Sequence, residues 1–424
     1  MGAEAPSGAD IATAPGQYGV ELDRMRYLGI DLARSVAIIF VIIGHALAAS
    51  NMGEGGVAIY TLRFFLSVSP PVFFCLFGCM LQLVYARQYE AGRQVEIIQR
   101  LLTRSVQCWL LYVLTCAGMC IAAGLPFTYF VRCALLLGDT PFTDILKFYA
   151  MLMLAAPLLV HVSVTRGLLP LVAIVAAVQL LFPVISRIPP IQGFPGAEAV
   201  SAFLYGGQYL GHTGPSVIHG LGFVVFGMLL GRFWQARPGR EFLLSGPDWT
   251  LRLAFLGLFS VTALWIALGN FDFSQPDVRT LLRNTNHPLY LLFGCTATVF
   301  FVEFFTAIRR FSGIGTSSFW MIFGRTSLFT FCFGNILLYA VHLWDPAAPA
   351  DPVRFAVSSV VALSLSVIYA RVRDSRFIKS SGSPAAKAYR WVADDSAASL
   401  VRFVTSPFLH RPQRRSRTSP TPGL

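Results

Sequence analysis

The stretch that decides the fold reads Leu28-Gly-Ile-Asp31-Leu-Ala-Arg34-Ser-Val-Ala-Ile-Ile-Phe-Val-Ile-Ile-Gly44-His45-Ala-Leu47. It is long and apolar enough to cross a bilayer as a helix, yet it carries Asp31, Arg34 and His45. At about 100° per residue, Arg34 and His45 point within roughly 20° of each other, and Asp31 about 40° from His45. Ionisable groups are expensive inside a membrane, so this polar stripe of roughly 20 Å predicts a functional site.

The composition indicates that the rest of the chain is also rich in membrane helices. Of 424 residues, 55% are hydrophobic and only 13% are charged, whereas soluble domains are about a quarter charged. The fold class expected is all-α, a polytopic membrane protein with about ten transmembrane helices. The apolar windows are 29–50, 57–85, 105–124, 142–163, 167–185, 216–235, 251–268, 288–308, 326–344 and 353–370.

Arginine placement predicts the orientation of these helices. Alternate connecting segments hold most of the arginines, among them Arg87, Arg166 and Arg232, while the intervening segments hold few, such as Arg132 and Arg187. By the positive-inside rule, both termini are expected to be cytoplasmic. The polar first 27 residues show no cleavable signal peptide.

We expect three parts: a polar N-terminal segment 1–27, a membrane domain 28–371, and a basic, disordered cytoplasmic tail 372–424. From Arg371 onward the chain has eleven Lys or Arg and three Asp, so this end supplies +8 of the net charge of +12. Contact with anionic lipid headgroups is the expected role, and nucleic-acid binding is not expected. The eight cysteines fall almost entirely in apolar windows without metal-ligand spacing, so no metal site is predicted.

His45 is the first candidate catalytic residue. An imidazole buried without a carboxylate contact favours its neutral, proton-accepting form and can act as a general base. The alternative is a histidine that only packs helices together.

Arg100 and Arg104 lie four residues apart at the cytoplasmic mouth of the third helix, where guanidinium groups suit the phosphates of a nucleotide-bearing donor. Ordinary positive-inside flanking explains them equally well.

Other polar residues fall within apolar windows. His219, Glu303 and Asn335 are candidate substrate contacts, and Asp144 with Lys147 is expected to form a self-neutralising pair. Two long outward loops, about 186–215 and 270–287, carry aromatic, amide and charged side chains. The first has Gln192, Tyr205, Gln208 and Tyr209, and the second has Asp272, Asp277, Arg279, Arg283 and His287. They either hold a sugar or merely connect helices.

At these residues the chain resembles the acyltransferase 3 family of integral membrane acyltransferases. Asp31, Arg34 and His45 match the family pattern of its first helix in type and spacing, and the segment Pro70-Pro-Val-Phe-Phe-Cys-Leu-Phe-Gly78 resembles the second helix. Two further segments look like the OpgC branch, which succinylates periplasmic glucans. They begin at Asp144-Ile-Leu-Lys and at Phe323-Gly-Arg-Thr-Ser. The chain departs from the family in having Leu101 beside Arg100, and Gly334 and Asn335 where many members have a late histidine.

The resemblance implies an O-acyltransferase of the bacterial inner membrane, transferring groups other than aminoacyl groups. It would move a succinyl or acetyl group from cytoplasmic acyl-CoA, a co-substrate and not a permanently bound cofactor, to a hydroxyl of an envelope glucan or polysaccharide. His45 would be the general base, Asp31 would orient Arg34, and Arg100 and Arg104 would hold the donor's phosphates. Two other classes stay open: a transporter or flippase that uses the same polar track, and a non-catalytic scaffold.

Overall fold

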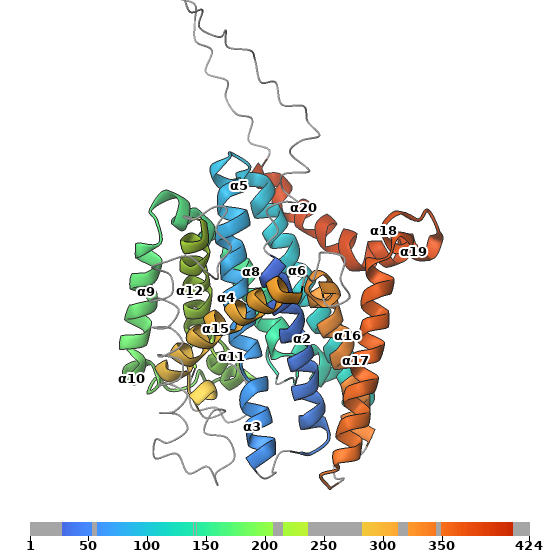
Figure 1. Ribbon diagram of the computed structural model, residues 1–424. Coiled ribbons are helices and arrows are strands. Elements are labelled where there is room, and N and C mark those ends of the chain that lie inside the picture. Colours follow the sequence, from blue (N-terminus) through green and yellow to red (C-terminus); the bar gives the residue numbers. More distant parts are fainter. Residues whose placement is uncertain are drawn as a thin grey trace, which may run out of the picture.

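The computed structural model describes residues 28–52, 57–206 except 139 and 141, 215–235, 282–312, 321–344 and 349–409. Every regular element among these residues is helical. Figure 1 shows most of the long helices running side by side as a bundle. A helix satisfies all of its backbone hydrogen bonds within one segment, which is what a lipid environment requires.

Among the described residues, eight helices are long and apolar enough to cross a membrane. The spans are Gly29–Ala49, Thr61–Glu90, Gln94–Ala122, Asp144–Thr165, Val217–Gln235, Pro288–Ile308, Ile322–Ala340 and Pro352–Ser380. A shorter apolar helix, α9 (Leu169–Leu180), occupies the fifth predicted window together with α10 (Phe182–Ile185). The predicted window 251–268 lies outside the described residues. The prediction of an all-α polytopic membrane protein is confirmed.

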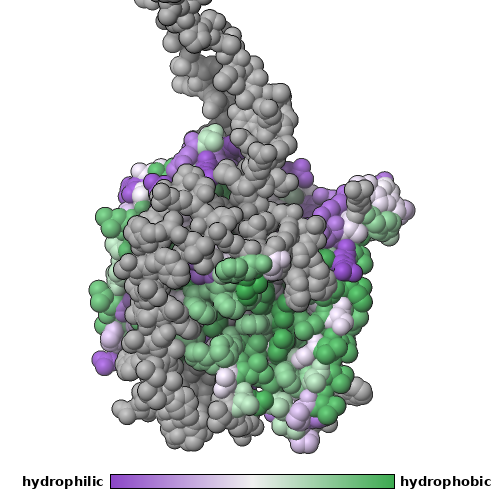
Figure 2. All heavy atoms as spheres, in the orientation of Figure 1, coloured by the Kyte–Doolittle hydropathy of each residue, from purple (hydrophilic) through white to green (hydrophobic). Residues whose placement is uncertain are grey.

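Long helices of the bundle are α2 (Leu28–Ala49), α6 (Gln94–Ala122), α8 (Asp144–Thr165), α12 (Val217–Gln235), α15 (Pro288–Ser312), α16 (Ile322–Trp344) and α17 (Pro352–Asp374). Connecting elements are α7 (Phe127–Ala134) and α11 (Ala197–Leu204). The side chains of α17 explain its place at the edge. Val357, Val360 and Ile368 are exposed hydrophobic residues of this helix, as expected for a surface that faces lipid. Figure 2 shows hydrophobic residues gathered along the middle of this side of the bundle.

The second predicted window, 57–85, is divided into several elements. They are α3 (Val57–Leu66), α4 (Ser69–Met80), the π-helix η1 (Leu81–Ala86) and α5 (Arg87–Glu90). A proline cannot donate a backbone hydrogen bond within a helix, so Pro70 and Pro71 are accommodated in the first turn of α4. Farther along, Gly78 lets α4 approach α12, because a Cβ atom at this position would lie 2.0 Å from the Val224 carbonyl oxygen.

The two ends of the bundle are named here after residues of α2, and cross-helix contacts mark the first of them. Ser35 of α2 accepts a hydrogen bond from the Gly324 amide of α16 at 2.7 Å, and Arg325 pairs with Asp374 of α17 at 2.9 Å. These contacts define the Arg34 end. The other end, where α2 finishes, contains His45 and is called the His45 end. Figure 1 shows α5 and α20 (Ser396–Leu409) at the Arg34 end and α3 and α10 at the opposite end.

The C-terminal region differs from the predicted disordered tail. It forms α18 (Arg376–Ser380), α19 (Pro384–Arg390), a π-helix η3 (Trp391–Asp395) and α20 (Ser396–Leu409), and α20 packs on α6. The prediction of disorder was therefore wrong for residues 376–409. Composition alone missed the small apolar residues Ala386, Ala397 and Val401, which are buried. Residues 410–424 lie outside the described part of the chain.

Candidate active site

Asp31 and Arg34 lie at the Arg34 end of α2. The carboxylate of Asp31 and a guanidinium nitrogen of Arg34 are 3.9 Å apart, and their side chains are 15% and 20% exposed. Both side chains are therefore mostly buried, and Asp31 is the partner of Arg34 one helical turn before it.

The backbone around Asp31 is fixed by close contact with α16. The Ser35 hydroxyl donates to the Asp31 carbonyl oxygen at 3.0 Å and accepts from the Gly324 amide. A Cβ atom at position 324 would lie 2.4 Å from the same carbonyl oxygen. Gly324 thus gives α16 a position without a side chain where α2 crosses it.

His45 lies eleven residues after Arg34, about 16 Å farther along the helix axis. It is half-buried and lies between two aromatic rings. The centroid of its ring is 4.9 Å from that of Phe142 and 5.9 Å from that of Phe331. The imidazole therefore faces other helices of the bundle and not lipid.

Asn335 of α16 holds the imidazole in one orientation. Its Oδ1 atom lies 2.8 Å from Nδ1 of His45, and its Nδ2 group donates to the Phe142 carbonyl oxygen at 2.9 Å. Because the amide nitrogen is used by Phe142, the amide oxygen faces His45, and Nδ1 must be the protonated nitrogen. Nε2 is then left with its lone pair, and it has no hydrogen-bond partner among the described residues.

A second layer of polar contacts surrounds this pair at the His45 end. The Thr143 hydroxyl lies 3.0 Å from the Tyr339 hydroxyl, and the Phe142 ring contacts the Tyr339 ring at 5.6 Å. Sequence reasoning missed Phe142, Thr143 and Tyr339, because nothing in their local pattern distinguishes them from ordinary residues of a membrane helix.

Lys147 is the most deeply buried cation near this end. Its side chain is 1% exposed, and Nζ lies 3.4 Å from the Asp144 carboxylate and 4.8 Å from the centroid of the Phe203 ring. The predicted pairing of Asp144 and Lys147 is confirmed. The carboxylate and the aromatic face together offset the loss of water around the ammonium group.

The two arginines assigned to the donor phosphates lie on the first half of α6, at the Arg34 end. Arg100 is bound to Glu96 at 2.8 Å, and Arg93 reaches the same carboxylate at 2.6 Å. Arg104 donates to the Gln107 side chain at 3.0 Å. Gln107 in turn donates to Asp394 of η3 at 3.2 Å, so the C-terminal helices contact this surface.

The three candidate substrate residues lie in different places. Asn335 touches His45. His219 contacts the Ser216 hydroxyl at 2.7 Å and the Phe182 ring, and none of its contacts among the described residues is with His45. Glu303 follows Phe301, whose ring packs on Phe40 at 5.8 Å, and α15 continues from there to Thr306 beside Gly29. Glu303 is therefore nearer the Arg34 end than the His45 end.

No metal centre is visible in the part of the chain that the structure describes, where no three His, Cys, Asp or Glu side chains gather. All eight cysteines are buried free thiols.

The family model for an acyltransferase domain, Acyl_transf_3, matches residues 27–371. The chain belongs to the acyltransferase 3 family. This acyltransferase 3 domain contains Asp31, Arg34, His45 and Asn335, and the protein is a multi-pass membrane acyltransferase. No curated protein matches the chain.

Proposed function

We propose that this acyltransferase moves an acyl group from a cytoplasmic acyl-CoA to a hydroxyl of a glucan or related polysaccharide of the cell envelope, with His45 as general base. The observation that carries the proposal is the His45–Asn335 contact of 2.8 Å, in which the amide is itself oriented by the Phe142 carbonyl oxygen. A histidine that only packs helices together does not need its tautomer fixed by an amide that is held on both sides.

The proposed reaction uses Nε2 of His45. This nitrogen takes the proton from the acceptor hydroxyl while the hydroxyl oxygen attacks the thioester carbonyl carbon. When the carbon–sulfur bond breaks, the coenzyme A thiolate leaves, and the imidazolium returns the proton to it. The products are an ester and a free thiol. General-base assistance of this kind is typically worth a hundred- to ten-thousand-fold in rate.

The donor would enter from the Arg34 end, which we assign to the cytoplasm because the arginine-rich connections lie there. Arg100 and Arg104 would hold its phosphates at the surface. Arg34 is mostly buried and would meet the acyl arm on its way to His45. The membrane would be a bacterial inner membrane, and the acyl group succinyl or acetyl, as the resemblance to the OpgC branch implies.

The experiment compares envelope saccharides by mass spectrometry in cells that carry wild-type protein, His45→Ala or His161→Ala. His161 is a matched control, because it also makes one side-chain hydrogen bond, 2.8 Å to the Tyr89 hydroxyl. We expect His45→Ala to abolish ester-linked acyl groups at a normal protein level, and His161→Ala to retain them. Acyl groups that persist in His45→Ala would refute the role of His45.

The same cells separate the enzyme from a transporter. A transporter or flippase would leave the number of acyl groups per saccharide unchanged and alter only where the saccharide accumulates. An enzyme alters the number of acyl groups per saccharide.

A further inference from the structure

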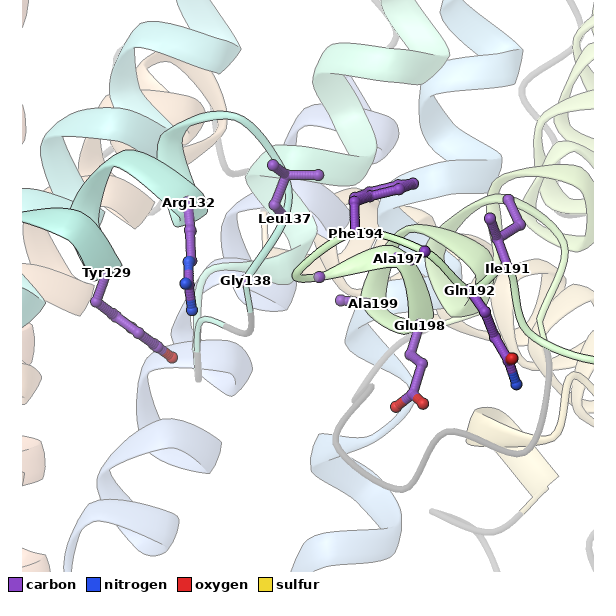
Figure 3. A pocket seen from close by; sticks show the side chains of 12 residues that line it. Tyr129, Arg132, Leu137, Gly138, Ile191, Gln192, Phe194, Ala197, Glu198 and Ala199 are labelled. Atoms are coloured by element: carbon purple, nitrogen blue, oxygen red, sulfur yellow. The ribbon is translucent and has the colours of Figure 1, made fainter.

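A cavity of about 450 Å³ lies between α7 and the loop that leads into α11. This volume is within the usual range for small-molecule sites. Tyr129 and Arg132 come from α7, while Gln192 and Phe194 come from the loop and Glu198 from α11. Figure 3 shows Tyr129, Arg132, Gln192 and Glu198 pointing to the same side of the ribbon.

Three charged or amide side chains of this cavity have no part in holding the described fold together. Arg132, Gln192 and Glu198 make no side-chain hydrogen bond or ion pair with any residue that the structure describes. Glu198 and Arg132 carry opposite charges, so their sum is zero. A cation, an anion, an amide and two aromatic rings suit a neutral ligand with many hydroxyl groups, since each polar group can bind hydroxyls and each ring can cover an apolar sugar face.

The walls of the cavity are held by contacts that do not involve its ligand-facing groups. Trp109 and Tyr112 of α6 donate to the carbonyl oxygens of Ala134 and Cys133, which fixes the end of α7. On the other side, the Tyr205 hydroxyl donates to the Pro189 carbonyl oxygen at 2.9 Å, and the Ile191 amide donates to the Ser201 hydroxyl at 2.7 Å.

The two walls meet at Gly196. This residue has φ +91°, a backbone conformation that favours glycine, and a Cβ atom there would lie 2.3 Å from the Leu137 carbonyl oxygen. The cavity is therefore formed before any ligand arrives.

The wall of the cavity and the surroundings of His45 include residues that are close in the sequence. Leu137 and Gly138 form part of its wall. Phe142 follows four residues after Gly138, and its ring packs on His45 while its carbonyl oxygen orients Asn335. Four residues of chain span at most about 15 Å, so a saccharide of a few units bound in the cavity is long enough to reach toward the imidazole.

We infer that this cavity binds a neutral saccharide unit of the acceptor, next to the unit whose hydroxyl reaches His45. This inference rests on the proposed function for the identity of the acceptor. Arg132, Gln192 and Glu198 bind hydroxyl groups, and Tyr129 and Phe194 cover the sugar ring. The class of ligand is a neutral oligosaccharide, in contrast to an anionic glycan, which would require an excess of cations.

The test measures binding of neutral glucose oligosaccharides of increasing length to the purified full-length protein in nanodiscs, by calorimetry and without acyl donor. We expect binding by wild type and by His45→Ala. Arg132→Ala and Glu198→Ala should each weaken binding about tenfold or more, the usual effect of losing a hydrogen bond to a charged group. Arg187→Ala removes an arginine outside the cavity and should bind as wild type does. Thermal unfolding of each variant shows that it is folded.

The outcomes separate the cavity from the catalytic proposal. Equal binding by wild type, Arg132→Ala and Glu198→Ala would overturn the cavity assignment and leave the role of His45 untouched. Absence of oligosaccharide binding by wild type would also overturn it. Loss of binding in both cavity variants, with binding retained in His45→Ala, would support it even if His45→Ala kept its acyl-transfer activity.

Discussion

The proposed base and the proposed phosphate ligands are held in different ways. At the His45 end, a half-buried imidazole is bound to an amide that is fixed by a backbone carbonyl. At the Arg34 end, Arg100 shares Glu96 with Arg93 on an exposed surface. Surface ion pairs are worth little and exchange readily, whereas an oriented hydrogen bond inside a membrane protein sets a geometry. Fixed geometry suits a chemical step, and an exchangeable pair suits a ligand that comes and goes.

Asn335→Ala, which removes the amide that orients His45, should have the largest effect. Without the amide, the imidazole can rotate and take either tautomer, and a misplacement of about 1 Å can cost about a hundredfold in rate. We expect kcat to fall by about that factor while the affinity for acyl-CoA is unchanged, measured with purified protein by thiol release and by direct donor binding. An unchanged kcat would show that Asn335 does not position the base.

Gly324→Val tests the close contact between α2 and α16. The added side chain would collide with the Asp31 carbonyl oxygen, and overpacking of this kind typically costs about 1–3 kcal/mol. We expect a lower midpoint of thermal unfolding in detergent. Gly382→Val is the control, since nothing lies within 4 Å of a Cβ atom at that position. Equal midpoints for both variants would show that α2 can move away without penalty.

Glu96→Gln tests the exposed ion pairs at the Arg34 end. The carboxylate occupies Arg93 and Arg100, so its neutralisation frees both guanidinium groups for phosphate. We expect acyl-CoA to bind several-fold more tightly to Glu96→Gln, and about tenfold more weakly to the double variant Arg100→Ala, Arg104→Ala, since each exposed charge contact contributes at most about 1 kcal/mol. Unaltered donor affinity in the double variant would remove these arginines from the donor site.

The smallest effect concerns His287, which lies just before α15. Partial burial lowers the pKa of His287 below its ordinary value of 6.5, so the folded protein favours the neutral ring. Stability should therefore be fully present above pH 6.5 and decrease as the pH falls through that value, because the unfolded chain binds the proton more readily. His287→Gln should slightly reduce the drop in thermal midpoint between pH 7 and pH 5. An identical drop in both proteins would contradict this.

The fold class and the candidate base could both be predicted from the amino-acid sequence alone. Apolar windows predict helices because a bilayer leaves the backbone no other partners, and Asp31, Arg34 and His45 are conspicuous because charge is rare in such windows. Phe142 and Asn335 are separated by almost two hundred residues, and only tertiary packing brings both to His45. The same is true of the cavity walls, and of the C-terminal helices, whose buried contacts with α6 are invisible to composition. Local patterns encode where a chain meets lipid, whereas the orientation of a side chain depends on partners far away in the sequence.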